Sequence, residues 1–371
     1  MTSRFTDAKR VIIKIGSSLL VDDETGTLHR PWLEALTADV GVCRARGQEV
    51  IIVSSGAIAL GRRHLELGDK KLRLEESQAA AAAGQIRLAH AYQETLALHG
   101  MHTAQLLLTI SDTEARRRYL NARNTINALL KVGAVPVINE NDTVATDEIR
   151  FGDNDRLAAR VAEMASADCL ILLSDIDGLY DGDPRHDDNV RLIPEVREIT
   201  PEIEDMAGQA GAAFASGGMV TKLAAARIAL NAGCHMAITD GRQLNPLVAL
   251  ENGAACTWFV STATPRNARK RWILGSLSPA GKLVVDAGAA GALSGGKSLL
   301  PAGVQSISGE FGRGDAVIVC DADGTELGRG LSAYSAHDAR LIIGHKSGEI
   351  EELLGYRGRD EIIHRDDLAL I

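Results

Sequence analysis

The sequence has few aromatic residues, scattered cysteines and no long apolar run, and each shortage excludes a class of protein. Aromatic residues are 4% of the 371, too few to predict a stacking platform for single-stranded nucleic acid. The five cysteines are far apart and form no CxxC pair, so we expect a reduced cytoplasmic protein without disulfides or a zinc ribbon. No stretch approaches the roughly 18 apolar residues of a membrane span, and residues 1–10 hold no apolar signal segment.

The charge is moderately negative. Lys and Arg number 40 against 49 Asp and Glu, a net charge of -9, which repels nucleic-acid backbones and anionic lipid. We therefore expect neither a membrane partner nor a general nucleic-acid partner. The hydrophobic content of 45% is enough for a sizeable core, and the length fits two or three domains of about 150 residues each.

Apolar runs of strand length alternate with helical patterns through the first 260 or so residues. The runs are Val11–Ile15, Val50–Val53, Ala134–Ile138 and Leu170–Leu173. They are continuously apolar, as in strands that are buried on both faces of a parallel sheet. Between them, Ser77–His99 and Asp112–Lys131 read as helices, the second with Asp112 as its cap. This pattern predicts an α/β fold with a mainly parallel sheet flanked by helices, an αβα sandwich.

The pattern changes after the basic residues of segment 266–272. Short β-branched pieces separated by glycine turns follow, and they predict a small β-barrel. We expect an α/β domain over residues 1–262, a linker over 263–277, the β module over 278–360 and a tail over 361–371. From residue 276 onward, nine Lys and Arg face fourteen Asp and Glu. This balance argues against RNA binding by the module, because contacts to a nucleic-acid backbone need clustered cations.

Ligands of open α/β sheets bind beyond the carboxyl ends of the strands, and all four apolar runs end in small or polar residues. Lys14 lies inside or at the end of the first apolar strand, where an unpaired ammonium is expensive to bury. It is either a phosphate-binding cation or an edge lysine whose ammonium reaches the surface. The absence of GxSxG and HExxH motifs removes support for a hydrolase.

Two further segments carry charge near predicted helix starts. Ser216–Lys222 places two glycines, Thr221 and Lys222 at the start of a helix, which suits either an anion-binding loop or an ordinary helix cap. Asp153, Asn154 and Asp155 also precede a helical stretch. They fit an acidic helix terminus, a clamp for a substrate amine, or a carboxylate that orients lysines.

With these segments assembled, the sequence resembles the glutamate 5-kinases, a branch of the amino acid kinase family. The resemblance spans nearly the whole chain. Its motifs are Ile13–Ser18, Val53–Ile58, Val135–Asp142, Gly152–Asp155, Leu173–Asp175 with Gly178–Tyr180, and Gly217–Met219 with Thr221–Lys222. The carboxyl-terminal module is similar to a PUA domain, a small β-barrel first known from RNA-modifying enzymes.

The resemblance implies transfer of the γ-phosphoryl group of ATP to the side-chain carboxylate of L-glutamate, with Mg²⁺ and no assigned protein ligand for the metal. It implies catalytic roles for Lys14, Lys222 and Asp155. Glutamate would be held by Ser55, Asp142 and Asn154. The residues implied in ATP binding are Lys14, Ser174, Asp175, Ser216, Gly217, Gly218, Met219, Val220, Thr221 and Lys222. Tyr180, Asp183 and Pro184 belong to the same family segment, near adenine.

The resemblance also implies partners. It suggests feedback inhibition by L-proline, a homo-oligomer (a dimer or tetramer), and transfer of the product to glutamate-5-semialdehyde dehydrogenase. The alternatives are a sibling kinase acting on acetylglutamate, aspartate or a nucleoside monophosphate, an RNA-binding protein that uses the PUA-like module, and a regulatory sensor without catalysis. The presence of Lys14, Asp155 and Lys222 disfavours the sensor.

Overall fold

The computed structural model describes residues 3–22, 25–68, 70–145, 153–184, 187, 189–209, 218–275 and 278–371. The chain divides into two compact units, Met1–Pro265 and Arg266–Ile371, and each is described by itself. None of the helices in the described residues combines the length and apolarity that crossing a bilayer requires.

The first unit is built around an eight-stranded sheet. Its order is β3-β4-β2-β1-β5-β7-β8-β6. The strands are β1 (Arg10–Ile15), β2 (Glu49–Val53), β3 (Thr103–Leu108), β4 (Val135–Glu140), β5 (Cys169–Ser174), β6 (Glu195–Val196), β7 (His235–Asp240) and β8 (Cys256–Phe259). The first six in this order are mutually parallel, so their carboxyl ends share one edge. β8 is antiparallel to β7 and parallel to β6, so β8 and β6 end at the opposite edge.

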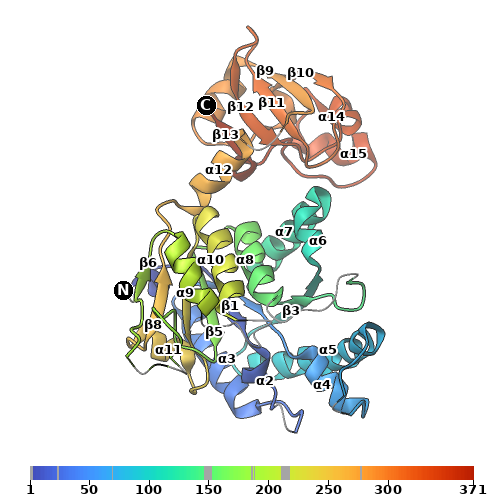
Figure 1. The fold of residues 1–371 in the computed structure, drawn as a ribbon. Coiled ribbons are helices and arrows are strands. Elements are labelled where there is room, and N and C mark those ends of the chain that lie inside the picture. The colour runs from blue at the N-terminus through green and yellow to red at the C-terminus, as the bar shows by residue number, and fades with distance from the viewer. Residues whose placement is uncertain are drawn as a thin grey trace. The chain divides into compact units, whose positions relative to one another are not determined.

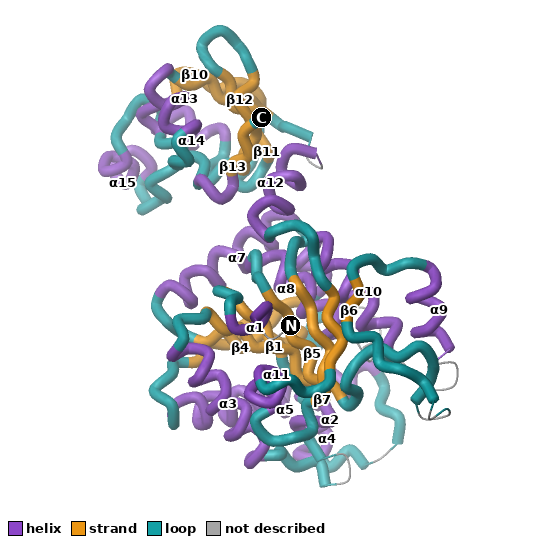
Figure 2. Tube along the Cα trace, turned by 90° about the vertical axis from the view of Figure 1, so that its left-hand side faces the viewer, coloured by secondary structure: helices purple, strands orange, loops and turns teal. Residues whose placement is uncertain are grey.

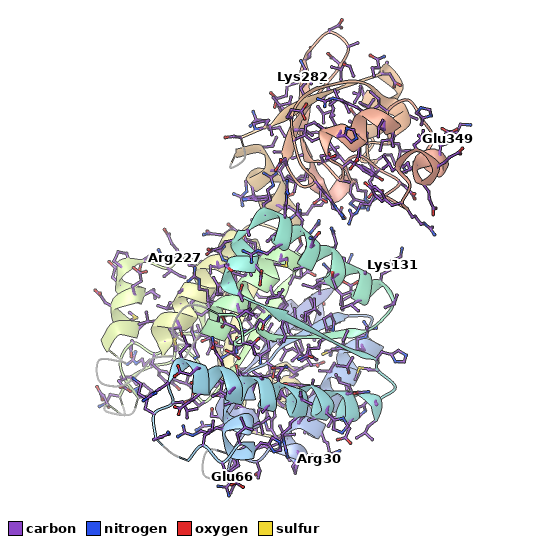
Figure 3. All side chains as sticks on the ribbon, turned by 90° about the vertical axis from the view of Figure 1, so that its right-hand side faces the viewer. Arg30, Glu66, Lys131, Arg227, Lys282 and Glu349 are labelled. Atoms are coloured by element: carbon purple, nitrogen blue, oxygen red, sulfur yellow. The ribbon has the colours of Figure 1, made fainter. Side chains whose placement is uncertain are left out.

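Helices cover both faces of this sheet, as Figures 1 and 2 show. One face packs against α3 (Arg30–Ala45), α5 (Leu74–Ala97) and α11 (Pro246–Glu251). The other face packs against α7 (Arg116–Lys131), α8 (Asp153–Ala165) and α10 (Met219–Asn231). Charged side chains such as Arg30 of α3 and Arg227 of α10 lie on the outer surfaces of these two layers (Figure 3). The αβα sandwich predicted from the apolar runs is confirmed.

Side-chain alternation along β1 decides where Lys14 points. Ile13 and Ile15 belong to the core on the α3 and α5 face, whereas Ile12 belongs to the core under α8 and α10. Because successive strand residues face opposite sides, Lys14 lies on the same face as Ile12, toward α8 and α10. The Lys14 side chain therefore points from β1 toward α8 and α10, the helices that carry Asp155 and Lys222.

The predicted helix Asp112–Lys131 is wrong in one respect. It is two helices, α6 (Ile110–Glu114) and α7, which meet at Ala115. Thr109 caps α6 by accepting a hydrogen bond from Asp112 N at 3.2 Å, and the Asp112 carboxylate accepts one from Thr109 N at 2.7 Å. Asp112 is therefore the acidic third residue of a capping box and not the cap.

The second unit holds a five-stranded sheet in the order β10-β9-β11-β12-β13. The strands are β9 (Gly281–Val285), β10 (Val304–Gly309), β11 (Ala316–Cys320), β12 (Glu326–Leu331) and β13 (Leu368–Leu370). β9 and β11 are parallel and the other neighbours are antiparallel. The helices are α13 (Ala287–Ser294), α14 (Ala336–Ile342) and α15 (Ile350–Leu354). Together they enclose a separate hydrophobic core.

Two segments that flank the predicted β module belong structurally to this second unit. Helix α12 (Pro265–Gly275) lies within the predicted linker. Its Arg269 pairs with Asp367 at 2.5 Å between side chains that are 8% and 9% exposed, and its Leu274 carbonyl accepts a hydrogen bond from Arg329. The predicted tail, 361–371, contributes β13, which pairs with β12. The predicted domain boundaries stay predictions.

Candidate active site

The carboxyl-terminal edge of the large sheet gathers the predicted site residues in strand order. Asp142 follows β4, Ser55 follows β2, Lys14 lies in β1, and Ser174 ends β5. The sheet order places β4 and β2 on one side of β1, with β5 and β7 on the other. The predicted glutamate residues thus fall on one half of the edge and the predicted nucleotide residues on the other. We call these the acceptor half and the donor half.

Three predicted catalytic residues meet at the middle of this edge. Asp155, in the first turn of α8, forms an ion pair through Oδ1 with Lys14 Nζ at 2.6 Å, and its Oδ2 accepts a hydrogen bond from Lys222 Nζ at 3.4 Å. Asp155 is 1% exposed, Lys14 8% and Lys222 7%. One buried carboxylate therefore bridges two ammonium groups from different elements and leaves the group of three with a net positive charge.

The electrostatics of Asp155 explain why such burial is tolerated. Burial by itself raises the pKa of this carboxyl, but the charges of Lys14 and Lys222 and a hydrogen bond from Thr221 outweigh it, so that the pKa lies below the ordinary carboxyl value. Asp155 is therefore ionised at neutral pH. Its charge holds together two lysines that would otherwise repel each other.

The amino terminus of α10 supplies the neighbouring contacts. Gly218 is the N-cap, and Thr221 donates through its hydroxyl to the Gly218 carbonyl at 2.9 Å and to Asp155 Oδ2 at 3.2 Å. Met219 is partly buried, whereas Val220 is 60% exposed. Ser216 and Gly217, also predicted in nucleotide binding, lie outside the described residues.

A network of polar side chains forms the acceptor half. Asn154 Nδ2 donates to Ser55 Oγ at 2.8 Å, to the Ser54 carbonyl at 3.0 Å and to Asn139 Oδ1 at 3.2 Å. Asn139, 3% exposed, in turn donates to Gln85 Oε1 at 2.8 Å. Asp142, which follows β4, is 9% exposed. The predicted Ser55 and Asn154 are thus in direct contact.

Sequence reasoning did not single out Asn139 or Gln85. Asn139 opens the tract Asn139–Asp142, so its position at a strand end was a usable signal. Gln85 carried no such signal in the sequence, because it lies in the middle of helix α5. Only the fold brings this part of α5 into contact with Asn139 of β4. Nearby, Ser54 and Tyr92 share a hydroxyl hydrogen bond of 2.9 Å in the core, which fixes the backbone just before Ser55.

Two helices that approach very closely support Ser55. α4 (Ala57–His64) starts two residues after it and crosses α5 at Gly61 and Gly84. A Cβ on Gly84 would overlap the Ala57 carbonyl oxygen, and one on Gly61 would overlap that of Ala80. The two glycines allow backbone contact, which anchors the start of α4 and hence the loop that presents Ser55.

The donor half begins at the end of β5. Ser174 Oγ donates to Asp175 Oδ1 at 3.0 Å; Ser174 is buried, 6% exposed, and Asp175 is exposed. Tyr180 donates to both carboxylate oxygens of Asp177, at 3.0 and 3.1 Å. Asp183 and Pro184 follow in the same loop.

Comparison with known proteins gives the family. Residues 9–240 match the amino acid kinase family and residues 281–354 match the PUA domain. The glutamate 5-kinase of Paramagnetospirillum magneticum is 66% identical over 98% of this chain and 98% of its own. That of Rhodospirillum rubrum is 60% identical over 97% of this chain and 96% of its own. Carbamate kinase from Giardia lamblia bound to AMP-PNP shares the fold, with a TM-score of 0.50 and 17% identity over 69% of this chain and 99% of that chain.

The matches to curated relatives cover both units and include every segment that forms the edge described above. The resemblance inferred from the motifs is confirmed by these identities. The chain therefore belongs to the amino acid kinase family and, within it, to the glutamate 5-kinases.

Proposed function

We propose that this protein transfers the γ-phosphoryl group of ATP to the side-chain carboxylate of L-glutamate, giving L-glutamyl 5-phosphate and ADP. The observation that carries the proposal is the buried Lys14–Asp155–Lys222 bridge, which lies between the acceptor and donor halves of the edge. Relatives at 66% and 60% identity carry the name of this activity.

The reaction requires no covalent bond between the protein and the substrates. A carboxylate oxygen of glutamate, already ionised at neutral pH, attacks the γ-phosphorus in line as the bond to the ADP oxygen breaks. No general base is needed, so catalysis consists of positioning and neutralisation of charge. In this mechanism Lys14 and Lys222 contact the transferring phosphoryl oxygens from two elements, and Asp155 keeps both ammonium groups oriented.

Each half of the edge has a matching role. Ser55 and Asn154, already hydrogen-bonded to each other, would bind the glutamate carboxylates, and the Asp142 carboxylate would receive its ammonium group. Ser174, Asp175 and the start of α10 would bind the nucleotide. Asn139 and Gln85 would act as positioning residues for Asn154.

Magnesium fits this arrangement as a companion of ATP. No three His, Cys, Asp or Glu side chains gather into a metal-binding cluster in the described part of the chain, which suits an ion that binds mainly through phosphates, waters and one or two carboxylates. Asp175, exposed at the end of β5, is the carboxylate that would hold it, since Asp155 faces the lysines. When bound, Mg²⁺ would offset charge on the phosphate oxygens.

The direct test measures glutamyl phosphate as its hydroxamate with purified protein, ATP and Mg²⁺. We expect hydroxamate with L-glutamate and none with acetylglutamate or aspartate. A nucleoside monophosphate, whose phosphorylated product gives no hydroxamate, is tested by release of ADP, and we expect none. Equal turnover of acetylglutamate would contradict the role of Asp142, because that compound lacks the free ammonium group. The same assay with added L-proline tests the predicted feedback inhibition, and sedimentation tests the predicted homo-oligomer.

Transfer of the product to glutamate-5-semialdehyde dehydrogenase also stays a prediction. An acyl phosphate hydrolyses readily, so a consuming reductase nearby would protect it. A gel-shift titration with mixed cellular RNA at low salt tests the competing use of the PUA domain, whose acidic balance argues against binding.

A further inference from the structure

The turn that follows β7 carries no predicted role, although it belongs to the donor half. β7 lies beside β5 in the sheet, and Asp240 is paired in register with Ser174. Asp240, Gly241 and Arg242 therefore leave the sheet at the same edge as Ser174 and Asp175.

This turn is fixed against the end of β5. Gly241 N donates to the Ser174 carbonyl at 2.8 Å, and the indole nitrogen of Trp32 donates to the Gly241 carbonyl at 2.6 Å. A Cβ on Gly241 would come within 2.6 Å of Leu19 Cδ1 and 2.9 Å of Leu173 Cβ. Both peptide groups of Gly241 are thus held, and only glycine fits this approach.

Arg242 is oriented by Asp240 and not by the core. Its Nε lies 3.0 Å from Asp240 Oδ1, its Nη2 lies 2.7 Å from Oδ2, and its backbone N donates to Oδ1 at 2.9 Å. The Arg242 side chain is 65% exposed, so the ion pair adds little to stability. Its other charged neighbours, Asp175 and Asp177, are also acidic.

The position along the edge selects a part of the nucleotide. Adjacent strands are about 4.8 Å apart, so β7 lies about 10 Å from β1. A nucleotide whose γ-phosphate lies at Lys14 and Lys222 and whose chain runs along the donor half brings its α-phosphate and ribose over β5 and β7. Three carboxylates line that stretch, Asp175, Asp177 and Asp240, and a polyanion there needs a cation.

We propose that Arg242 binds the α-phosphate of the nucleotide, with Asp240 as the positioning residue that presents its guanidinium. The inference rests on the proposed function in that it takes a nucleoside triphosphate as the phosphoryl donor. It adds a contact from β7 to a site otherwise formed by β1, β5, α8 and α10.

The test compares two ligands that differ in the phosphates alone. Calorimetry on the full-length protein gives the Kd of ADP and of adenosine for wild type, Arg242→Gln and Arg242→Lys. We expect Arg242→Gln to raise the Kd of ADP about tenfold, as for loss of one exposed charge-assisted hydrogen bond. The Kd of adenosine should rise less than twofold. Arg242→Lys, which keeps the charge without the planar fork, should recover part of the loss.

The chain offers a matched control. Arg197 is 70% exposed and pairs with Glu195 two residues earlier at 2.7 Å, as Arg242 pairs with Asp240. It follows β6, which ends at the opposite edge of the sheet. Arg197→Gln makes the same change in net charge, so its ADP affinity should stay within twofold of wild type.

Steady-state kinetics provide a second measurement. Arg242→Gln should raise the KM for ATP about tenfold and leave the KM for glutamate within twofold. An ADP affinity within twofold of wild type, or equal losses for ADP and adenosine, would overturn the assignment. Because calorimetry needs no turnover, it decides the role of Arg242 even if glutamate proves not to be the acceptor.

Discussion

Asp155→Asn tests the central bridge most directly, because it removes the charge and keeps the size of the side chain. Asp155 is 1% exposed and lies between two lysine ammonium groups, at 2.6 and 3.4 Å. The substitution leaves two buried cations without their common partner. Loss of one partner of a buried ion pair costs about 3–5 kcal/mol, so we expect the free energy of unfolding at pH 7 to fall by about that amount.

The same substitution should slow catalysis. Without Asp155, Lys14 and Lys222 repel each other and lose their shared orientation toward the phosphoryl group. Removal of one preorganised charge contact typically lowers kcat by about 10²- to 10³-fold, and we expect a loss in this range. Hydroxamate formation at saturating ATP and glutamate measures it, and urea denaturation followed by circular dichroism measures the stability.

The pH dependence has a defined sign. The pKa of Asp155 is lowered in the folded protein, so its stabilisation is fully present above the unfolded carboxyl pKa of about 3.9 and is lost as the pH falls through the folded value. The stability difference between wild type and Asp155→Asn should therefore be constant near neutrality and shrink in strong acid. A difference that grows as the pH falls would contradict the ion-pair account.

Asp39→Asn is the control for loss of a buried carboxylate. Asp39, also 1% exposed, accepts hydrogen bonds from Asn245 Nδ2 and Leu247 N, both at 2.9 Å. Asp39→Asn should lower the free energy of unfolding, because it disturbs these buried hydrogen bonds. Its kcat should stay within twofold of wild type, because Asp39 lies away from the lysines. If Asp155→Asn instead had the same free energy of unfolding as wild type and a kcat within fivefold of it, the bridge would have no catalytic importance.

Three further substitutions separate the other parts of the site. Lys222→Ala should lower kcat by orders of magnitude with a native circular dichroism spectrum; near-normal hydroxamate formation would remove Lys222 from the mechanism. Ser55→Ala should raise the KM for glutamate several-fold and leave that for ATP within twofold, and the reverse pattern would exchange the two halves of the edge. Gly84→Ala should lower the thermal midpoint by several degrees, because its Cβ would overlap a carbonyl of α4. Its control is Gly41→Ala in α3, whose Cβ would make only ordinary contacts with His99; this variant should be neutral or stabilising.

Much of the fold could be predicted from local pattern. Four continuously apolar runs identified the central strands, since only strands buried on both faces read that way. The same rule missed β3, whose residues Thr103 and Gln105 interrupt the apolar pattern, and the antiparallel pair β7 and β8. It also joined α6 and α7, because helical periodicity continues through Ala115 and only backbone geometry reveals the break.

The sequence motifs also indicated which residues belong to the site. Lys14, Asp155 and Lys222 were identifiable as charged residues at strand or helix ends, where burial is expensive without a partner. Their mutual contacts were not, because residues 14, 155 and 222 are brought together only by the order of strands β1 and β5 and by the helices that cover one face.

The sequence by itself therefore determined the fold class, the family and the chemical character of the site, since periodicity, composition and motif spacing are local properties of the chain. Tertiary structure alone decided which carboxylate bridges which ammonium groups, how Gln85 and Asn139 hold Asn154, and that Arg242 faces the donor half. These depend on strand order and side-chain direction, which join residues far apart in the chain.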